Sequence, residues 1–224
     1  MHSIAPPDGV GRVRSFVAIE LGDPARPAVE AYLAGLRAIV ADVAWTRPEN
    51  LHLTLKFLGD VDTARLDALA ARLAAIVTQQ PPFTMTVAGV GGFPSFKRPR
   101  VLWVGVSAGA LEPLAAAVDA ACAAEGFPLE TRPFHPHVTL GRVRSDRGDP
   151  RGRRSHSRRR DRGTPRPDAA AALAARCAPD RDLRFGDAPA VALVLFRSRL
   201  SPDGARYEPL AHLPFGSAAP VRYS

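Results

Sequence analysis

The sequence holds LHLTLKFLG at residues 51–59 and HPHVTLGRV at residues 135–143, and the two stretches share the tetrapeptide His-x-Thr-Leu. Apolar and polar residues alternate in both, which is typical of a β-strand with one face in a core. In a strand, residues i and i+2 point to the same face. Each stretch therefore presents a histidine beside a threonine, with an apolar backing: His52 with Thr54, and His137 with Thr139.

Outward from these stretches, short apolar runs alternate irregularly with amphipathic segments. Helical spacing of apolar residues predicts helices over residues 24–43, 63–78, 111–124 and 168–177. β-Branched and aromatic runs predict strands over residues 14–21, 51–59, 83–90, 101–106, 134–143, 190–200 and 205–213. Several strands follow one another like hairpins. We therefore predict an α+β fold with antiparallel or mixed sheets, and not a doubly wound parallel sheet.

The positive charge of the chain is concentrated in one segment. The formal net charge is +8 over 224 residues, and residues 144–167 alone contain ten arginines against three aspartates. This segment has no Leu, Ile, Phe, Tyr or Trp, so we predict that it is a disordered loop. Two roles remain open for it: a tolerated solvated insertion, or an electrostatic arm that contacts RNA phosphates.

The composition excludes several classes of protein. With 46% hydrophobic and 23% charged residues the chain is typical of a globular protein, and no apolar stretch is long enough for a membrane span. Residues 1–11 lack the apolar core of a secretory signal, so we expect a cytoplasmic protein without membrane contact. Cys122 and Cys177 stand apart from any Cys/His cluster, and no glycine-rich nucleotide loop is present. We expect neither a metal nor a cofactor.

Two histidines that face one groove suit the hydrolysis of a phosphodiester without a metal. An unperturbed imidazole has a pKa of about 6.5, so one ring can act as base and the other as acid at neutral pH. Threonine hydroxyls can donate hydrogen bonds to the non-bridging phosphate oxygens. A 2′,3′-cyclic phosphate is a fitting substrate because its five-membered ring is strained. For a single His-x-Thr the simpler reading is a polar pair on a solvated strand, and the second copy argues against it.

At these residues the chain resembles the 2H phosphoesterase superfamily, and most closely its RNA 2′,3′-cyclic phosphodiesterase branch, also called 2′-5′ RNA ligase. The likeness extends over nearly the whole chain, through residues 14–19, Trp45, residues 48–59, 92–94, 99–103, 136–142 and 198–207. It implies one bilobal, pseudo-twofold α+β domain over residues 12–224, with sheets around a central cleft and helices outside. Residues 144–167 would be an insertion within this domain.

The same resemblance implies that RNA ends with a 2′,3′-cyclic phosphate are hydrolysed to a 2′-phosphate without a metal, with 2′-5′ RNA ligation as the reverse. His52 and His137 match the catalytic pair, and Thr54 and Thr139 match the phosphate ligands. We expect His52 to be the proton donor to the O3′ leaving group and His137 to be the proton acceptor that activates water.

Arg142 matches a phosphate-proximal arginine of this branch. Strict alternation from His137 would turn Arg142 to the opposite face, and a bulge at Gly141 would turn it back. His135 shares a face with His137 but lacks a threonine partner, so we treat it as a neighbour. The candidates for stacking on a base are aromatic residues for which a core position is the commoner role: Phe57, Phe93, Phe96 and Phe134.

Two other functions remain open at this point. A non-catalytic RNA or nucleotide-binding protein would keep the groove as a recognition site. A phosphodiesterase for small cyclic nucleotides would keep the chemistry and change the substrate. The partner that we expect is RNA with a 2′,3′-cyclic phosphate end, with an additional electrostatic contact through residues 144–167.

Overall fold

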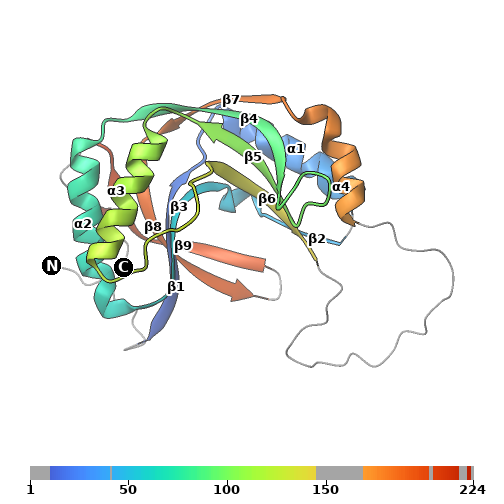
Figure 1. Ribbon diagram of the computed structural model, residues 1–224. Helices are drawn as coiled ribbons and strands as arrows, with labels where there is room; N and C mark the ends of the chain where they lie inside the picture. The colour runs from blue at the N-terminus through green and yellow to red at the C-terminus, as the bar shows by residue number, and fades with distance from the viewer. Residues whose placement is uncertain (1–10, 41, 145–168, 202–203, 217–220, 223–224) are drawn as a thin grey trace, which may run out of the picture.

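The computed structural model describes residues 11–40, 42–144, 169–201, 204–216 and 221–222 (Figure 1). Apart from Arg144, the segment 144–167 that we predict as an Arg-rich loop lies outside the described residues. No helix among the described residues is both long and apolar enough to cross a membrane.

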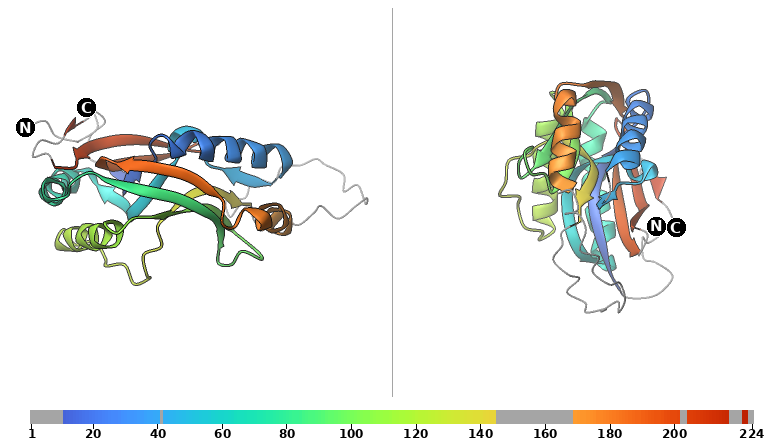
Figure 2. Two further views of the ribbon diagram at one scale, coloured as in Figure 1. Left: turned by 90° about the horizontal axis from the view of Figure 1, so that it is seen from above. Right: turned by 90° about the vertical axis from the view of Figure 1, so that its right-hand side faces the viewer.

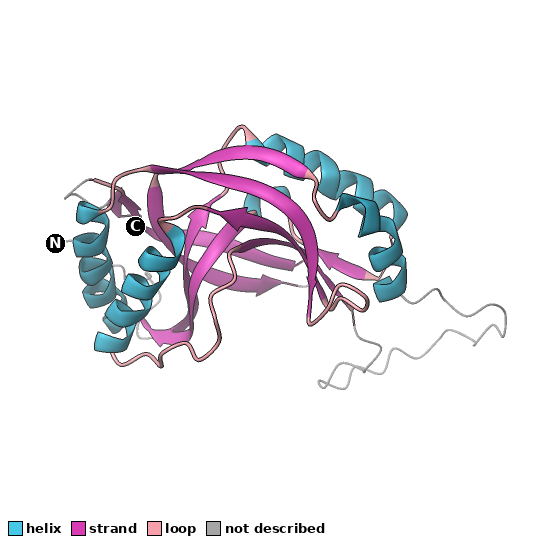
Figure 3. Cartoon of the chain, turned by 45° about the horizontal axis from the view of Figure 1, so that its top comes forward, coloured by secondary structure: helices cyan, strands magenta, loops and turns pink. Residues whose placement is uncertain are grey.

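The strands form a single curled antiparallel sheet (Figure 3). They are β1 (Arg12–Glu20), β2 (Val43–Trp45), β3 (His52–Asp62), β4 (Phe83–Phe93), β5 (Val101–Ser107), β6 (His137–Val143), β7 (Arg184–Ala190), β8 (Ala192–Ser201), β9 (Gly204–Pro214) and β10 (Val221–Arg222). Their order in the sheet is β10-β9-β8-β1-β3-β6-β5-β4-β7, and β2 pairs with β6. The α+β prediction with antiparallel pairing is thus confirmed.

The helices gather at the two ends of the sheet (Figures 1 and 2). They are α1 (Ala25–Ile39), α2 (Leu66–Gln79), α3 (Leu111–Ala124) and α4 (Ala169–Cys177), with 3-10 turns η1 (Pro48–Asn50), η2 (Thr63–Arg65) and η3 (Ala178–Asp180). Helices α2 and α3 lie side by side, α3 against β3, while α1 packs on β7. The helices cover the apolar face of the sheet, and the motif residues lie on its other face.

The core contains the apolar residues that alternate with the motif residues. Leu53 and Leu55 of β3 and Val138 and Leu140 of β6 are all buried in one large cluster with the apolar stripes of α1 and α2. The alternation that predicts the two motif strands is therefore the feature that attaches them to the core, and it leaves the histidines on the open side.

Several elements differ from the sequence prediction. The helix predicted over residues 24–43 ends at Ile39, because the chain turns at Asp42, whose φ of 59° lies in the left-handed region that aspartate tolerates. Residues 43–45 then pair with β6 as β2. Strand β7 was not predicted, since Gly186 and Pro189 interrupt its alternation and are tolerated at a sheet edge.

Candidate active site

Strands β3 and β6 meet in the middle of the sheet, where Leu53 pairs with Val138. Both side chains are buried in the core. The residues that flank this pair point to the opposite face, which we call the motif face: His52, Thr54, His137 and Thr139. Antiparallel pairing sets His52 across from Thr139, so the two histidines lie diagonally across the strand pair. The structure therefore brings all four sequence-predicted residues together.

Each motif histidine is oriented by a hydrogen bond to the backbone carbonyl two residues before it. The Nδ1–H of His52 donates to the carbonyl oxygen of Asn50 at 2.7 Å, and that of His137 donates to the carbonyl oxygen of His135 at 2.7 Å. Because a carbonyl can only accept, the proton of each neutral ring is on Nδ1 and Nε2 carries the lone pair. The Nε2 of His52 lies 3.0 Å from the Oγ1 of Thr54, whose hydroxyl can donate to it. In both rings Nε2 is the atom that can take or give a proton.

His52 lies in a cluster of aromatic rings. Phe16 stacks on it at 4.9 Å between ring centroids with an interplanar angle of 29°, and Tyr207 meets it edge-on at 5.2 Å. Burial among these rings lowers the pKa of His52 to about 4, the hydrogen bond to Asn50 opposes this shift, and the charge of a protonated His137 lowers the pKa further. His52 is therefore neutral at pH 7.

His137 has its own aromatic neighbours. Phe93 meets its ring edge-on at 5.1 Å, and Trp103 lies 6.1 Å away. Burial lowers the pKa of His137, and the positive charges of His135 and Arg142 act in the same direction, against the hydrogen bond to the His135 carbonyl. Both motif rings thus favour their neutral forms until an anion enters.

A bulge in β6 determines where Arg142 points. Leu102 pairs with Gly141 and Trp103 with Thr139, so one extra residue stands between these pairs on β6. Gly141 is required here, because a Cβ would come within 2.7 Å of the Trp45 ring. Burial raises the pKa of Tyr207, and the positive charges of Arg142 and Arg14 oppose this shift; the charge of Arg142 also lowers the pKa of His137. The bulge thus directs Arg142 toward the motif face, and its charge accordingly acts on the pKa values of His137 and Tyr207.

A second bulge, in β3, was not predicted. Val17 pairs with Lys56 and Ala18 with Thr54, so Leu55 is the extra residue. Lys56 consequently leaves the motif face, where alternation from His52 would put it, and is 3% exposed. Phe57 turns to the motif face, where it is 57% exposed and lies 6.1 Å from Phe16. Of the four aromatic candidates, Phe57 is therefore the most exposed, and it lies beside Phe16, the ring that stacks on His52.

The other candidates have different positions. Phe93 lies against both His135 and His137, Phe134 packs against the core, and Phe96 lies beyond the β4–β5 hairpin end. His135 is exposed and contacts the Trp103 ring at 4.8 Å. Sequence reasoning did not assign a role at the site to the rings of Phe16, Trp103 and Tyr207. The sequence shows that these three residues lie in alternating, strand-like runs. It does not show which strands are neighbours in the sheet, and so does not bring the three rings to the site. Among the described residues, no cluster of three or more His, Cys, Asp or Glu side chains is arranged to hold a metal ion.

Comparison with known proteins shows to which family the chain is similar. Residues 19–103 and 104–172 match the family described as LigT-like phosphoesterase. Proteins named RNA 2′,3′-cyclic phosphodiesterase are similar to the chain. The one from Geobacillus stearothermophilus is 35% identical over 132 residues, which is 58% of this chain and 42% of that protein. The one from Archaeoglobus fulgidus is 39% identical over 133 residues, 59% of this chain and 73% of that protein. The chain thus spans less than half the length of the first relative.

Solved structures share the fold. Escherichia coli LigT complexed with 3′-AMP has a TM-score of 0.65 and 25% sequence identity, covering 91% of this chain and 98% of that chain. A Thermus thermophilus protein has a TM-score of 0.66 and 26% identity over the same shares of the two chains.

Proposed function

Because the chain belongs to the LigT-like phosphoesterase family, we propose that it hydrolyses the 2′,3′-cyclic phosphate at an RNA end to a 2′-phosphate, with two histidines and no metal ion. The observation that carries this proposal is the diagonal placement of His52 and His137 on one face, each with its Nδ1–H bound to a backbone carbonyl. Two such rings supply both proton transfers that the reaction needs.

In the proposed reaction, the cyclic phosphate lies on the motif face. The hydroxyls of Thr54 and Thr139 and the guanidinium of Arg142 bind its non-bridging oxygens, and the Thr54 hydroxyl gives up its bond to His52. Nε2 of His137 takes a proton from a water molecule, whose oxygen forms the new bond to phosphorus. The P–O3′ bond breaks, and protonated His52 gives its Nε2 proton to O3′. The products are a 2′-phosphate and a 3′-hydroxyl.

The bound phosphate also determines the protonation states. Burial favours the neutral form of both rings, and a nearby anion favours the charged form of an imidazole. A bound phosphate therefore allows a ring to hold a proton, and the proposed reaction needs that proton on His52 and a neutral His137. When the 5′-hydroxyl of a second RNA takes the place of water, the same steps give a 2′-5′ linkage, which is the reverse activity that we propose.

The product decides the proposal directly. The full chain is incubated with an oligoribonucleotide that ends in a 2′,3′-cyclic phosphate, in excess EDTA, and the ends are identified by chromatography. We expect full turnover to a 2′-phosphate. A 3′-phosphate product, or activity that requires an added divalent metal, would contradict the proposed function.

We also propose that the protein acts in the cytoplasm. Its two cysteines, Cys122 and Cys177, are buried free thiols, which fit a reducing compartment.

The pH dependence of kcat/KM is expected to reflect the burial of His52. The active free enzyme needs a proton on His52, whose pKa is about 4, and a neutral His137, whose pKa is also lowered. Above both pKa values this form becomes about tenfold rarer with each pH unit. We therefore expect kcat/KM to fall steadily as pH rises through 7, and kcat to hold to higher pH because bound phosphate raises both pKa values.

Phe16→Leu is the informative variant for this profile. It removes the ring that stacks on His52, so the fall in kcat/KM should begin at higher pH than in the unsubstituted chain. A flat kcat/KM between pH 6.5 and 8 in the unsubstituted chain is the result that this explanation does not permit.

A further inference from the structure

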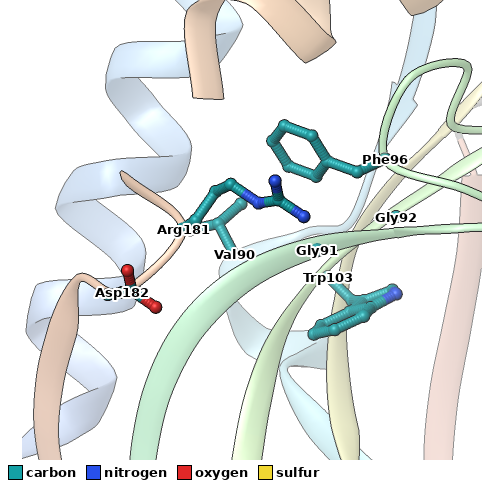
Figure 4. A pocket seen from close by; sticks show the side chains of 7 residues that line it. All are labelled: Val90, Gly91, Gly92, Phe96, Trp103, Arg181 and Asp182. Carbon is teal, nitrogen blue, oxygen red and sulfur yellow. The ribbon is translucent and has the colours of Figure 1, made fainter. Parts of the chain in front are cut away.

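A pocket of about 550 Å³ opens at the edge of β4 (Figure 4). Its lining combines a cation, a carboxylate, two aromatic rings and a stretch of bare backbone: Val90, Gly91, Gly92, Phe96, Trp103, Arg181 and Asp182. Pairing of β7 with β4 ends at Ala88, whereas β5 pairs with β4 as far as Phe93. Among the described residues, the glycines thus lie on a stretch of β4 with no strand beside it on the outer side.

Trp103 joins this pocket to the catalytic histidines. It pairs with Thr139 on one side and with Gly91 on the other. Its ring lies 6.1 Å from that of His137. Gly91 makes this arrangement possible, because a Cβ there would come within 2.1 Å of the indole. The Trp103 ring therefore lines the pocket and also lies beside His137.

Arg181 is held at the opposite wall of the pocket by the backbone. Its carbonyl accepts from the N–H of Val90 at 3.2 Å, and the carbonyl of Leu183 accepts from the N–H of Gly89 at 2.8 Å. Gly89 has a φ of 80°, and a Cβ there would meet the Arg181 carbonyl at 3.1 Å, so glycine suits this junction. The guanidinium lies over the Phe96 ring, 4.8 Å from its centroid, and reaches across the pocket (Figure 4).

We propose that this pocket binds the nucleotide on the 5′ side of the reacting RNA end, so that an RNA chain is preferred to a free cyclic mononucleotide. This inference rests on the proposed function and names its substrate class. A guanidinium binds phosphate oxygens with charge-assisted hydrogen bonds. Aromatic faces stack on any base, and the Asp182 carboxylate can accept from a base N–H. A free cyclic mononucleotide has no second nucleotide with which to fill the pocket.

The chemistry of the lining favours a nucleotide over other ligands. The Arg181 guanidinium lies against Phe96, which leaves the Trp103 ring as the lining aromatic on which a base can stack while Arg181 binds its phosphate. The volume falls within the roughly 300–1,000 Å³ of small-ligand sites. Arg181 and Asp182 also lie beyond residue 172, where the match to the family model ends, so the family match does not include these two residues.

The test compares a dinucleotide and a mononucleotide, each ending in a 2′,3′-cyclic phosphate, in three chains: unsubstituted, Arg181→Ala and Arg184→Ala. Arg184 is an exposed arginine on β7 that pairs with Asp187 outside the pocket. We expect the unsubstituted chain to prefer the dinucleotide. Arg181→Ala should raise KM for the dinucleotide about tenfold, the worth of one charge-assisted hydrogen bond, and leave the mononucleotide unchanged. Arg184→Ala should change neither.

The outcomes separate this inference from the proposed function. Equal losses on both substrates in Arg181→Ala, or an unchanged preference, overturn the pocket assignment while hydrolysis stands. If the unsubstituted chain turns over neither substrate, the proposed function fails, and calorimetry with the 2′-phosphorylated dinucleotide and mononucleotide tests the pocket alone. Arg181→Ala must then weaken only the dinucleotide, and identical affinities in both chains overturn the inference.

Discussion

His52→Ala and His137→Ala are each expected to lower turnover of an RNA 2′,3′-cyclic phosphate about 10²- to 10⁴-fold, since each removes one positioned proton transfer. Neither ring belongs to the large apolar core, but the His52 ring packs on Phe16 and Tyr207, so His52→Ala should lower the melting temperature more than His137→Ala while both chains stay folded. Single-turnover kinetics measure the loss, and circular dichroism measures the fold. His212→Ala, on β9 and outside both motifs, is the matched control and should keep full activity. Unreduced turnover in either motif variant would contradict the two-histidine mechanism.

A substrate with sulfur in place of O3′ assigns the two roles. A thiolate leaves without being protonated, so the loss of the acid matters little while the loss of the base still matters. With this substrate His52→Ala should regain most of its rate, and His137→Ala should remain slow. If the sulfur substrate restores the rate of His137→Ala alone, the assignment is reversed: His137 is then the proton donor and His52 the proton acceptor.

Lys56→Ala is expected to cost about 3–5 kcal/mol in the free energy of unfolding, the range found when one partner of a buried ion pair is removed. The Lys56 side chain is 2% exposed, and its Nζ lies 2.6 Å from Oδ1 of Asp119. It also donates to the carbonyl oxygen of Pro128 at 2.7 Å. The variant leaves a carboxylate and a carbonyl without this donor.

Urea denaturation followed by fluorescence measures this loss. The control is Lys97→Ala at the other lysine of the chain, which is exposed and should cost less than about 0.5 kcal/mol. A Lys56→Ala midpoint close to that of Lys97→Ala would show that the buried pair contributes little. Lys56 follows the β3 bulge that turns Phe57 outward, so we also expect the fluorescence and activity of this variant to be more sensitive to urea than those of the control.

The sequence was sufficient to predict elements whose pattern is local. The helix over residues 111–124 was predicted with its observed bounds, because its apolar stripe is regular and Gly126 follows it. The two motif strands were predicted for the same reason. Strand β7 was missed because its pairing with β4, and not its own composition, makes it a strand.

The sequence indicates which residues could form the candidate site, but it says less about the side chains that surround them. Alternation predicts that His52 and Thr54 share a face, but the bulge at Leu55 reverses the expected sides of Lys56 and Phe57. From the sequence alone, His52 is expected to have the near-neutral pKa of an isolated imidazole. Its pKa is lower because rings on β1 and β9 bury it. These strands are neighbours only through the sheet order, which no local pattern contains.

Main-chain carbonyls accept from the Nδ1–H of both imidazoles and so fix the tautomer of each ring. Every amino acid has such a carbonyl, so substitutions at positions 50 and 135 that preserve the chain path also preserve the tautomer of each ring. Substitutions at the exposed position 135 can then alter the polarity and shape beside His137 while its proton-carrying atom stays fixed, whereas Asn50 is buried and its side chain donates to the carbonyl oxygen of Ala205. Related chains can in this way diversify in substrate choice and still inherit one unchanged pair of proton-transfer groups.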